Sequence, residues 1–214
     1  MIINFLGDSI THGAGAACPE EAYVSVVGKM LGCEAKNYGI GGTRIARQNL
    51  LSAEHLYDLD FLMRSEVMGD ADLVFVFGGT NDFGHGAAEF GSLDSDDIYT
   101  FCGAVNTLLT RLTDRYGKDK ICVILPLHRA DENNPYGDGT KKKPGKLLKE
   151  YVWVLETLAG KYGVDVLEFN KEFPFSQIGV GEGLTIDGLH PNSYGHKILA
   201  EKICQYVRKK CNMQ

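Results

Sequence analysis

The sequence predicts an α/β protein in which a parallel β-sheet is covered by helices on both faces. Short apolar runs alternate along the chain with longer segments of helical periodicity, the pattern of strand–helix–strand units. Several of the apolar runs end at glycines, where a strand can turn sharply. The 214 residues are 44% hydrophobic and 23% charged, as is usual for globular proteins. This length fits a single domain spanning residues 1–214.

Five apolar runs predict the strands, and two of them, 73–77 and 121–125, are uninterrupted by polar residues. Continuous apolar runs are expected of parallel strands that are buried on both faces. The run at 34–38 is weaker, but glycines follow it directly. The five expected strands are residues 2–6, 34–38, 73–77, 121–125 and 164–168.

Helices are expected between these strands, from apolar residues at helical spacing and from capping signals. One helix is expected to start from a cap at Asp94, Ser95 or Asp96 and to end near Tyr116. Another is opened by Pro191 and ends in basic residues, which suit the helix dipole. The other expected helices are residues 21–31, 43 to about 68 with a break near 53–56, and 146–162.

The charge balance argues against nucleic acid as a partner. Lysine and arginine number 22 and acidic residues 28, a formal charge of −6 at pH 7, whereas nucleic-acid binders usually carry a basic face. The apolar runs are far shorter than the ~20 residues that a membrane-spanning helix needs. The first residues lack the basic start and the apolar length of a signal peptide, so a cytoplasmic protein is expected.

The six cysteines form neither a C-x-x-C pair nor a zinc-like cluster with histidine. Cys102, Cys122 and Cys204 fall in segments expected to be strand or helix. We therefore expect reduced, mostly buried thiols rather than a disulfide framework, and neither a bound metal nor a cofactor.

Polar side chains follow the expected strands at the points where the strands end. In parallel sheets, ligands bind beyond the carboxyl ends of the strands. Ser9 follows the first strand, Gly42 the second and Asn81 the third, while Asp187 and His190 precede the last helix. The sequence therefore predicts that these five residues gather at one edge of the sheet.

Three of these residues have the chemistry of a catalytic triad. A serine hydroxyl becomes an effective nucleophile when a base takes its proton, and histidine is suited to this near neutral pH. A carboxylate that bonds to the histidine fixes its tautomer. Asp187 stands three residues before His190, within reach over one turn. Ser9, His190 and Asp187 are therefore the candidate nucleophile, base and orienting acid.

The remaining residues can stabilise an oxyanion, which needs positioned hydrogen-bond donors. The backbone N–H groups of Ser9 and Gly42 can supply two donors, and the side-chain amide of Asn81 a third. The absence of a Cβ at Gly42 lets the backbone approach a substrate.

Simpler interpretations stay open for individual residues. Ser9 alone can be a helix cap, and Asn81 with Asp82 can close a turn. Asp8 is expected to hold the first loop rather than to act in chemistry. Competing motifs are incomplete: the glycines at 39–42 lack the last glycine of a dinucleotide loop because Arg44 occupies its place, and neither a Walker A nor a G-x-S-x-G sequence occurs.

Four short blocks, taken in order, resemble the SGNH hydrolases, also called GDSL-type esterases. They are Gly7-Asp8-Ser9-Ile10-Thr11, residues 37–42, Gly79-Thr80-Asn81-Asp82 and Asp187-Gly188-Leu189-His190. The resemblance implies Ser9 as nucleophile, His190 as base and Asp187 as its partner, with Gly42 and Asn81 as oxyanion donors. It also implies a three-layer α/β/α sandwich with the flavodoxin-like strand order 2-1-3-4-5, and no metal.

The expected substrate is a small carboxylic ester such as an acetyl ester, with a carbohydrate or another polar alcohol as the second part. Residues 83–97, 128–146 and 172–186 can shape its pocket, and they are rich in polar and aromatic side chains. His12 and His128 are further candidates for lining the cleft. A thioesterase or lysophospholipase is the alternative within the hydrolases, and a binding module without catalysis is the alternative outside them.

Overall fold

The computed structural model describes residues 1–49, 58–174 and 183–213. Its five strands form one sheet in the order β2-β1-β3-β4-β5, and every neighbouring pair is parallel. This confirms the predicted fold class and the strand order that the resemblance implies. The strands are β1 (Ile2–Gly7), β2 (Glu34–Gly39), β3 (Leu73–Phe77), β4 (Ile121–Ile124) and β5 (Asp165–Leu167).

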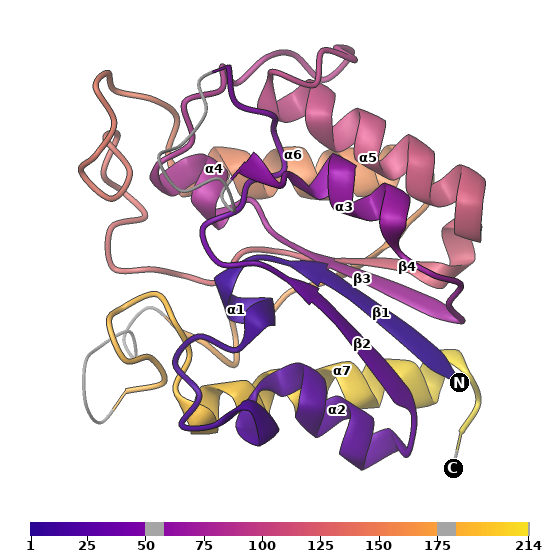
Figure 1. Cartoon of the computed structure of the whole chain (residues 1–214). Coiled ribbons are helices and arrows are strands. Elements are labelled where there is room, and N and C mark those ends of the chain that lie inside the picture. The colour runs from indigo at the N-terminus through magenta and orange to yellow at the C-terminus, as the bar shows by residue number, and fades with distance from the viewer. Residues whose placement is uncertain (50–57, 175–182, 214) are drawn as a thin grey trace.

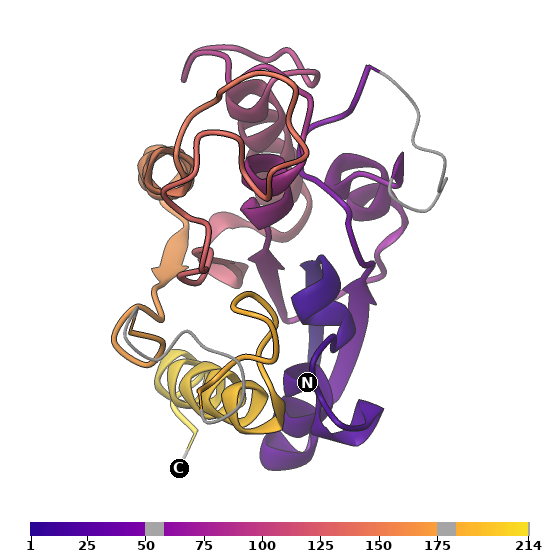
Figure 2. The same ribbon diagram turned by 90° about the vertical axis from the view of Figure 1, so that its left-hand side faces the viewer.

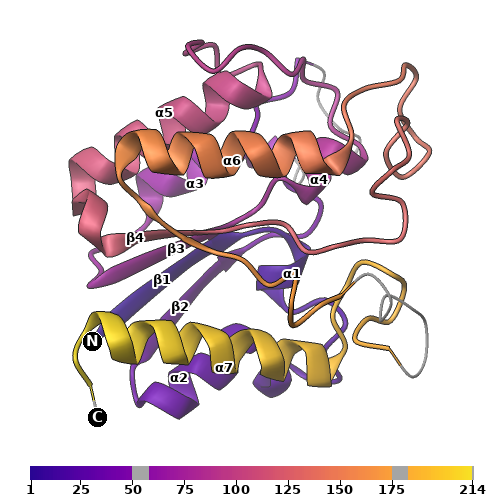
Figure 3. The ribbon, with the colours of Figure 1, turned by 180° about the vertical axis from the view of Figure 1, so that it is seen from behind.

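Helices cover both faces of this sheet (Figures 1 and 3). On one face lie α3 (Phe61–Val67), α4 (Thr80–Gly84), α5 (Phe101–Tyr116) and α6 (Leu148–Tyr162). On the other lie α2 (Tyr23–Leu31) and α7 (Ser193–Lys210). Short helices complete the described elements: α1 (Ser9–His12), η1 (Pro19–Glu21) and η3 (Lys118–Lys120).

The central strand β3 shows why its sequence is apolar throughout. Val74 and Val76 pack into the core cluster that includes residues of α3, α5 and α6. Leu73, Phe75 and Phe77 pack into the second cluster, with residues of α2 and α7. Successive side chains of a strand point to opposite faces, so a strand between two helical layers is apolar at every position.

The prediction of a helix from residue 43 is wrong for the first residues of that segment, 43–49. Residues 43–49 are irregular with bends, and the helical segment is α3, capped by Asp60, whose side chain accepts a hydrogen bond from Met63 N. The carboxylate of Asp82 accepts hydrogen bonds from the backbone N–H groups of Ile45 and Ala46, each at 2.9 Å. This contact from another element holds the segment in a non-helical path. The expected break near 53–56 lies outside the described residues.

Three other helix starts differ from expectation because another residue provides the start. Thr100 caps α5 in place of Asp94, Ser95 or Asp96, and its side chain accepts from Gly103 N. Asn192 rather than Pro191 precedes α7, and its side chain accepts from Gly195 N. The helix expected from 146 begins at Leu148, where the Glu150 side chain accepts from Leu147 N.

The carboxyl ends of the strands meet at one edge, which Figure 2 shows face on. Helix α1, the loop that follows β4 and the loop before α7 all lie at this edge. Within the described part of the chain, no helix is long and apolar enough to cross a membrane. All six cysteines are described; each is a free thiol, and Cys102, Cys122 and Cys204 are buried.

Candidate active site

Ser9 lies immediately after the sharp end of β1. Gly7 has no room for a side chain there, since a Cβ would lie 1.8 Å from Thr11 Oγ1. Asp8 caps α1, and its Oδ1 accepts a hydrogen bond from Ile10 N at 3.0 Å. Ser9 is then the first residue of α1, so its side chain starts from a fixed turn at the carboxyl edge of the sheet.

Ser9, His190 and Asp187 form one hydrogen-bonded series. Ser9 Oγ lies 2.9 Å from His190 Nε2, and His190 Nδ1 lies 2.6 Å from Asp187 Oδ2. An Nδ1–H that donates to the carboxylate leaves Nε2 free to accept the serine proton. The structure thus brings the three predicted catalytic residues together in the order their chemistry requires.

Asp187 is fixed by the chain that follows it. Its Oδ1 accepts hydrogen bonds from the backbone N–H groups of Leu189 at 3.0 Å and His190 at 2.7 Å. Burial alone would raise the pKa of Asp187, but the hydrogen bonds from His190 and Leu189 outweigh it and hold this pKa below its usual range. The carboxylate is therefore ionised at neutral pH, as a partner of an imidazolium should be.

The loop that carries His190 is anchored to the opposite end of the chain. A Cβ at Gly15 would lie 2.1 Å from the carbonyl oxygen of Pro191, so the two loops are in direct backbone contact there. Buried His196, on α7, lies between the same segments: its Nδ1 accepts from Tyr23 N at 3.3 Å, and its Nε2 lies 3.1 Å from Ala14 O. These contacts set Ser9 and His190 relative to each other.

Gly42 lies in a tight turn that comes close to Ser9, since a Cβ at Gly41 would lie 3.9 Å from Ser9 Cβ. Thr43 N donates to Ile40 O at 3.4 Å, and the φ of Gly42 is +72°, which is typical of the third residue of a type II turn. A positive φ favours glycine, and it sets the direction of the Gly42 N–H. The N–H can therefore serve as one of the predicted oxyanion donors.

Asn81 lies on α4 and bonds to the segment after Gly42. Its Nδ2 donates to the carbonyl oxygen of Thr43 at 3.0 Å. A side-chain amide has two protons, and this bond uses one of them. Asp82, the next residue, holds Ile45 and Ala46 as described above, and burial raises its pKa. Both interpretations of this block therefore have support, since the pair fixes a loop and still leaves an amide proton of Asn81 for a substrate.

Arg64 is a site residue that the sequence did not indicate. Arg64 is buried, with 6% of the residue exposed. Its guanidinium donates to Gly7 O at 2.8 Å, to Thr43 Oγ1 at 2.7 Å and to Tyr38 O. It therefore connects the ends of β1 and β2 with the turn of Gly42. Burial lowers the pKa of Arg64 to about 10, so the side chain stays charged at neutral pH. An arginine within a helix pattern is usually solvated, so the sequence carried no signal for this role.

Asp8, the residue before the candidate nucleophile, is buried. Burial raises its pKa to about 6, although the Ile10 N–H and the charges of His190 and Arg64 act in the opposite direction. Its hydrogen bond to Ile10 N agrees with the expected role of holding the first loop.

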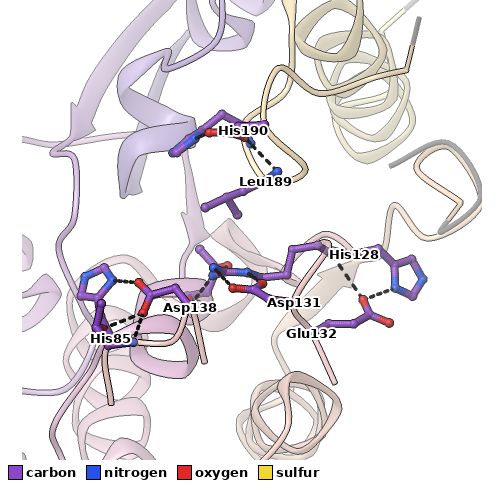
Figure 4. A network of polar contacts seen from close by, with 11 residues as sticks. His85, His128, Asp131, Glu132, Asp138, Leu189 and His190 are labelled. Carbon is purple, nitrogen blue, oxygen red and sulfur yellow. Dashed lines mark hydrogen bonds and ion pairs between the residues drawn. The ribbon is translucent and has the colours of Figure 1, made fainter. Parts of the chain in front are cut away.

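The polar residues expected at the rim largely pair with one another (Figure 4). Arg129 donates through Nη2 to Asp131 at 2.9 Å and through Nη1 to the carbonyl oxygen of Thr80 at 3.0 Å. His128 Nδ1 lies 2.8 Å from Glu132 Oε2. The rim loop also touches the catalytic loop, because Ala130 N donates to Gly188 O at 2.9 Å.

His128, which was expected to line the cleft, lines a cavity of about 170 Å³ that includes none of the five predicted site residues. The cavity mixes polar and apolar residues: Pro126, Leu127, His128, Glu132, Asn133, Leu148, Lys149, Val152 and Asn170. His12 ends α1 and is exposed. The rim segment 172–186 is described only in part, since 175–182 lie outside the described residues. Among the described residues, no three His, Cys, Asp or Glu side chains are grouped to hold a metal ion.

Solved structures with this fold include a protein from Lactobacillus plantarum, at 26% identity and a TM-score of 0.78, covering 97% of this chain and 96% of that chain. An acetyl xylan esterase is 23% identical with a TM-score of 0.67, covering 97% and 100%. A carbohydrate acetylesterase family member from Sinorhizobium meliloti is 17% identical with a TM-score of 0.65, covering 98% of each chain.

The sequence comparisons extend this likeness from fold to family. No curated protein matches the chain. The family model of the GDSL-like lipases and acylhydrolases matches residues 5–198, which include every block noted in the sequence. The chain therefore belongs to the GDSL-like lipase/acylhydrolase family of ester-hydrolysing enzymes.

Proposed function

We propose that the protein is a serine esterase that cleaves small carboxylic esters through an acyl-enzyme intermediate. The observation that carries the proposal is the series from Ser9 Oγ to His190 Nε2 and from His190 Nδ1 to Asp187 Oδ2, at 2.9 and 2.6 Å. Its members come from the two ends of the chain, and a merely structural role for Ser9 would not require this alignment.

In the first half of the reaction, Ser9 Oγ attacks the carbonyl carbon of the ester while its proton passes to His190 Nε2. Asp187 stabilises the resulting imidazolium. The negative charge on the carbonyl oxygen is met by the N–H groups of Ser9 and Gly42 and by the amide of Asn81. The intermediate then collapses: the bond to the alcohol oxygen breaks, and the proton on Nε2 passes to that oxygen.

In the second half, water takes the place of the alcohol. His190 Nε2 accepts a proton from the water, and the hydroxide attacks the acyl carbon of the acyl-enzyme. The bond to Ser9 Oγ breaks as the proton returns to it, and a carboxylic acid leaves. Because Nε2 accepts and donates in turn, the fixed tautomer of His190 serves both halves.

We further propose a short acyl group, such as acetyl, and a polar alcohol such as a sugar. Two relatives in fold are named for acetyl esters of carbohydrates. In this chain, the rim loop that contacts the catalytic loop through Ala130 N and Gly188 O carries polar side chains such as Asp131 and Glu132, to which a sugar can hydrogen-bond. Neither the cavity of about 170 Å³ beside His128 nor the one of about 370 Å³ between α5 and α6 includes a proposed catalytic residue.

The experiment compares p-nitrophenyl esters of increasing acyl length, together with acetylated xylose, on the wild type and Ser9→Ala. We expect the highest kcat/KM with acetyl, a burst of p-nitrophenol, and fluorophosphonate labelling that disappears in Ser9→Ala. A maximum at long acyl chains would favour the lysophospholipase alternative. An unlabelled and inactive wild type would leave only the binding module, and a Ser9→Ala variant with near-normal kcat would reject Ser9 as the nucleophile.

A further inference from the structure

His85, the residue that follows α4, contacts the turn that carries Gly42. Its Nε2 lies 3.2 Å from the carbonyl oxygen of Gly42. A carbonyl oxygen only accepts hydrogen bonds, so Nε2 carries the proton in this contact. The imidazole thus donates to the same residue whose N–H is a proposed oxyanion donor.

The other side of the ring faces a carboxylate. His85 Nδ1 lies 3.4 Å from Asp138 Oδ2, as Figure 4 shows. Asp138 is itself held by Thr140, whose backbone N–H and Oγ1–H both donate to Asp138 Oδ1. The ring thus faces a hydrogen-bond acceptor on each side, and its protonated form can donate to both.

The backbone around His85 is anchored as firmly as its ring. His85 N donates to Asn81 O at 3.0 Å, and Asp138 N donates to Gly84 O at 3.1 Å. Lys141 Nζ donates to Asp82 O at 3.1 Å from the same loop. The end of α4 thus connects Asn81 with His85, which follows four residues later and whose ring contacts Gly42.

A contact of this kind can stabilise the conformation of the turn that contains Gly42. In a type II turn, the direction of the central peptide, which carries the Gly42 N–H, depends on the positive φ of its third residue. Glycine adopts negative φ about as readily. A donor that holds the Gly42 carbonyl oxygen restrains this residue, because a change of φ and ψ would pull the oxygen away from the ring.

From these contacts we propose that His85 is a positioning residue of the oxyanion site, which keeps the Gly42 N–H directed at the carbonyl oxygen of the substrate. The proposal rests on the proposed esterase function. It assigns to His85 no proton transfer and no contact with the reacting atoms.

The test compares His85→Phe, which keeps a ring of similar size without a donor, with His85→Gln, whose side-chain amide can still donate to the Gly42 oxygen. Removing a whole oxyanion donor costs about 10²–10³ in kcat, so misdirecting one of three should cost about 10-fold. We expect that loss in His85→Phe, with little change in KM, and substantial recovery in His85→Gln. The melting temperature of each variant is measured alongside.

A second readout is inhibition by a trifluoromethyl ketone, which forms a tetrahedral adduct with the serine and places an oxyanion in the same site. Its affinity should fall in His85→Phe by the same factor as kcat. Equal kcat in the wild type and His85→Phe, or an equal loss in both variants, would overturn the positioning role. Loss of fluorophosphonate labelling in the wild type would instead reject the esterase function itself.

Discussion

The side-chain amide of Asn81 donates to the backbone carbonyl of Thr43 across 3.0 Å, from a helix on one strand end to a loop on another. The same side chain is the proposed oxyanion donor. Asn81→Ala should therefore lower kcat by about 10²–10³ with little change in KM, since the lost contact forms only in the transition state. It should also lower the melting temperature, because a buried carbonyl oxygen loses its donor. Steady-state kinetics and thermal unfolding of one preparation measure both.

Thr43→Val is the matched control for Asn81→Ala. It removes the Oγ1 that accepts from Arg64 and donates to Ile40 O, but it keeps the backbone carbonyl that Asn81 contacts. If Thr43→Val reproduced the whole loss of kcat at a similar melting temperature, Asn81 would act only by holding the loop.

Replacement of Asp187 by Asn should abolish most activity without unfolding the protein. An amide in that place favours the wrong tautomer of His190, and the corresponding change in the chymotrypsin-type triad costs about 10⁴ in kcat. Asp165→Asn is the control. Asp165 lies at the amino end of β5, where it accepts hydrogen bonds from Tyr206 and Lys210, so kcat should not change. A small loss in Asp187→Asn would mean that another group orients the imidazole.

Arg64→Met should impair both stability and catalysis. It removes the buried donor of Gly7 O, Tyr38 O and Thr43 Oγ1, at about 1–3 kcal/mol for a group left unsatisfied, although Gly7 O still accepts from Ile40 N and Thr43 Oγ1 still donates to Ile40 O. Arg64→Lys keeps the charge, but a single ammonium lacks the planar fork that serves several acceptors, so kcat should recover only in part. Urea unfolding and kcat are measured on both variants. A folded Arg64→Met variant with normal kcat would show that the turn keeps its shape unaided.

The raised pKa of Asp8 predicts that its contribution to stability decreases as the pH rises. An aspartate in the unfolded chain has a pKa near 3.9, and burial raises the pKa of Asp8 to about 6 in the folded protein. Between about pH 4 and pH 6 the folded state thus holds more protons than the unfolded state, so the contribution of Asp8 to the free energy of unfolding falls as the pH rises. Two units of pKa correspond to ~3 kcal/mol.

Asp8→Asn removes this titration and keeps an oxygen that can accept from Ile10 N. The free energy of unfolding of the variant minus that of the wild type should therefore grow between pH 4 and 6.5. Asp165→Asn should show the opposite trend, and only below about pH 4, because hydrogen bonds from Lys210 and Tyr206 lower the pKa of Asp165. Parallel curves for the wild type and Asp8→Asn would contradict the raised pKa.

Strands β3 and β4 were predictable because each is apolar at every position, which follows from burial on two faces. The edge strand β2 gave a weaker signal for the same reason, since its residues are only half-buried or exposed. The predicted helix at 43–49 was wrong because Asp82, far away in the sequence, binds two of its backbone N–H groups. Hydrophobic periodicity depends on residues that are close in sequence, so it cannot reveal a contact with a distant residue.

The sequence could suggest the five candidate site residues because each stands at the end or the start of an expected element, where ligands bind in parallel sheets. Arg64, His85 and His196 could not be found in this way. Each acts through backbone groups of other segments, such as Gly7 O for Arg64 and Ala14 O for His196. Every residue has a backbone carbonyl, whatever its type, so no sequence pattern marks the side chains that bind to one.

The hydrogen bond between Ser9 and His190 joins residues that are 181 positions apart in the chain. This separation affects the stage of folding at which the active site can form. During synthesis or refolding, the sheet can form around β1 and β3 while the residues that hold His190 are still undocked. A chain in that condition has the candidate nucleophile but no base. Ester hydrolysis should consequently begin only when α7 settles against α2, later than the formation of secondary structure, and the lag between the two signals would time the docking of the final helix.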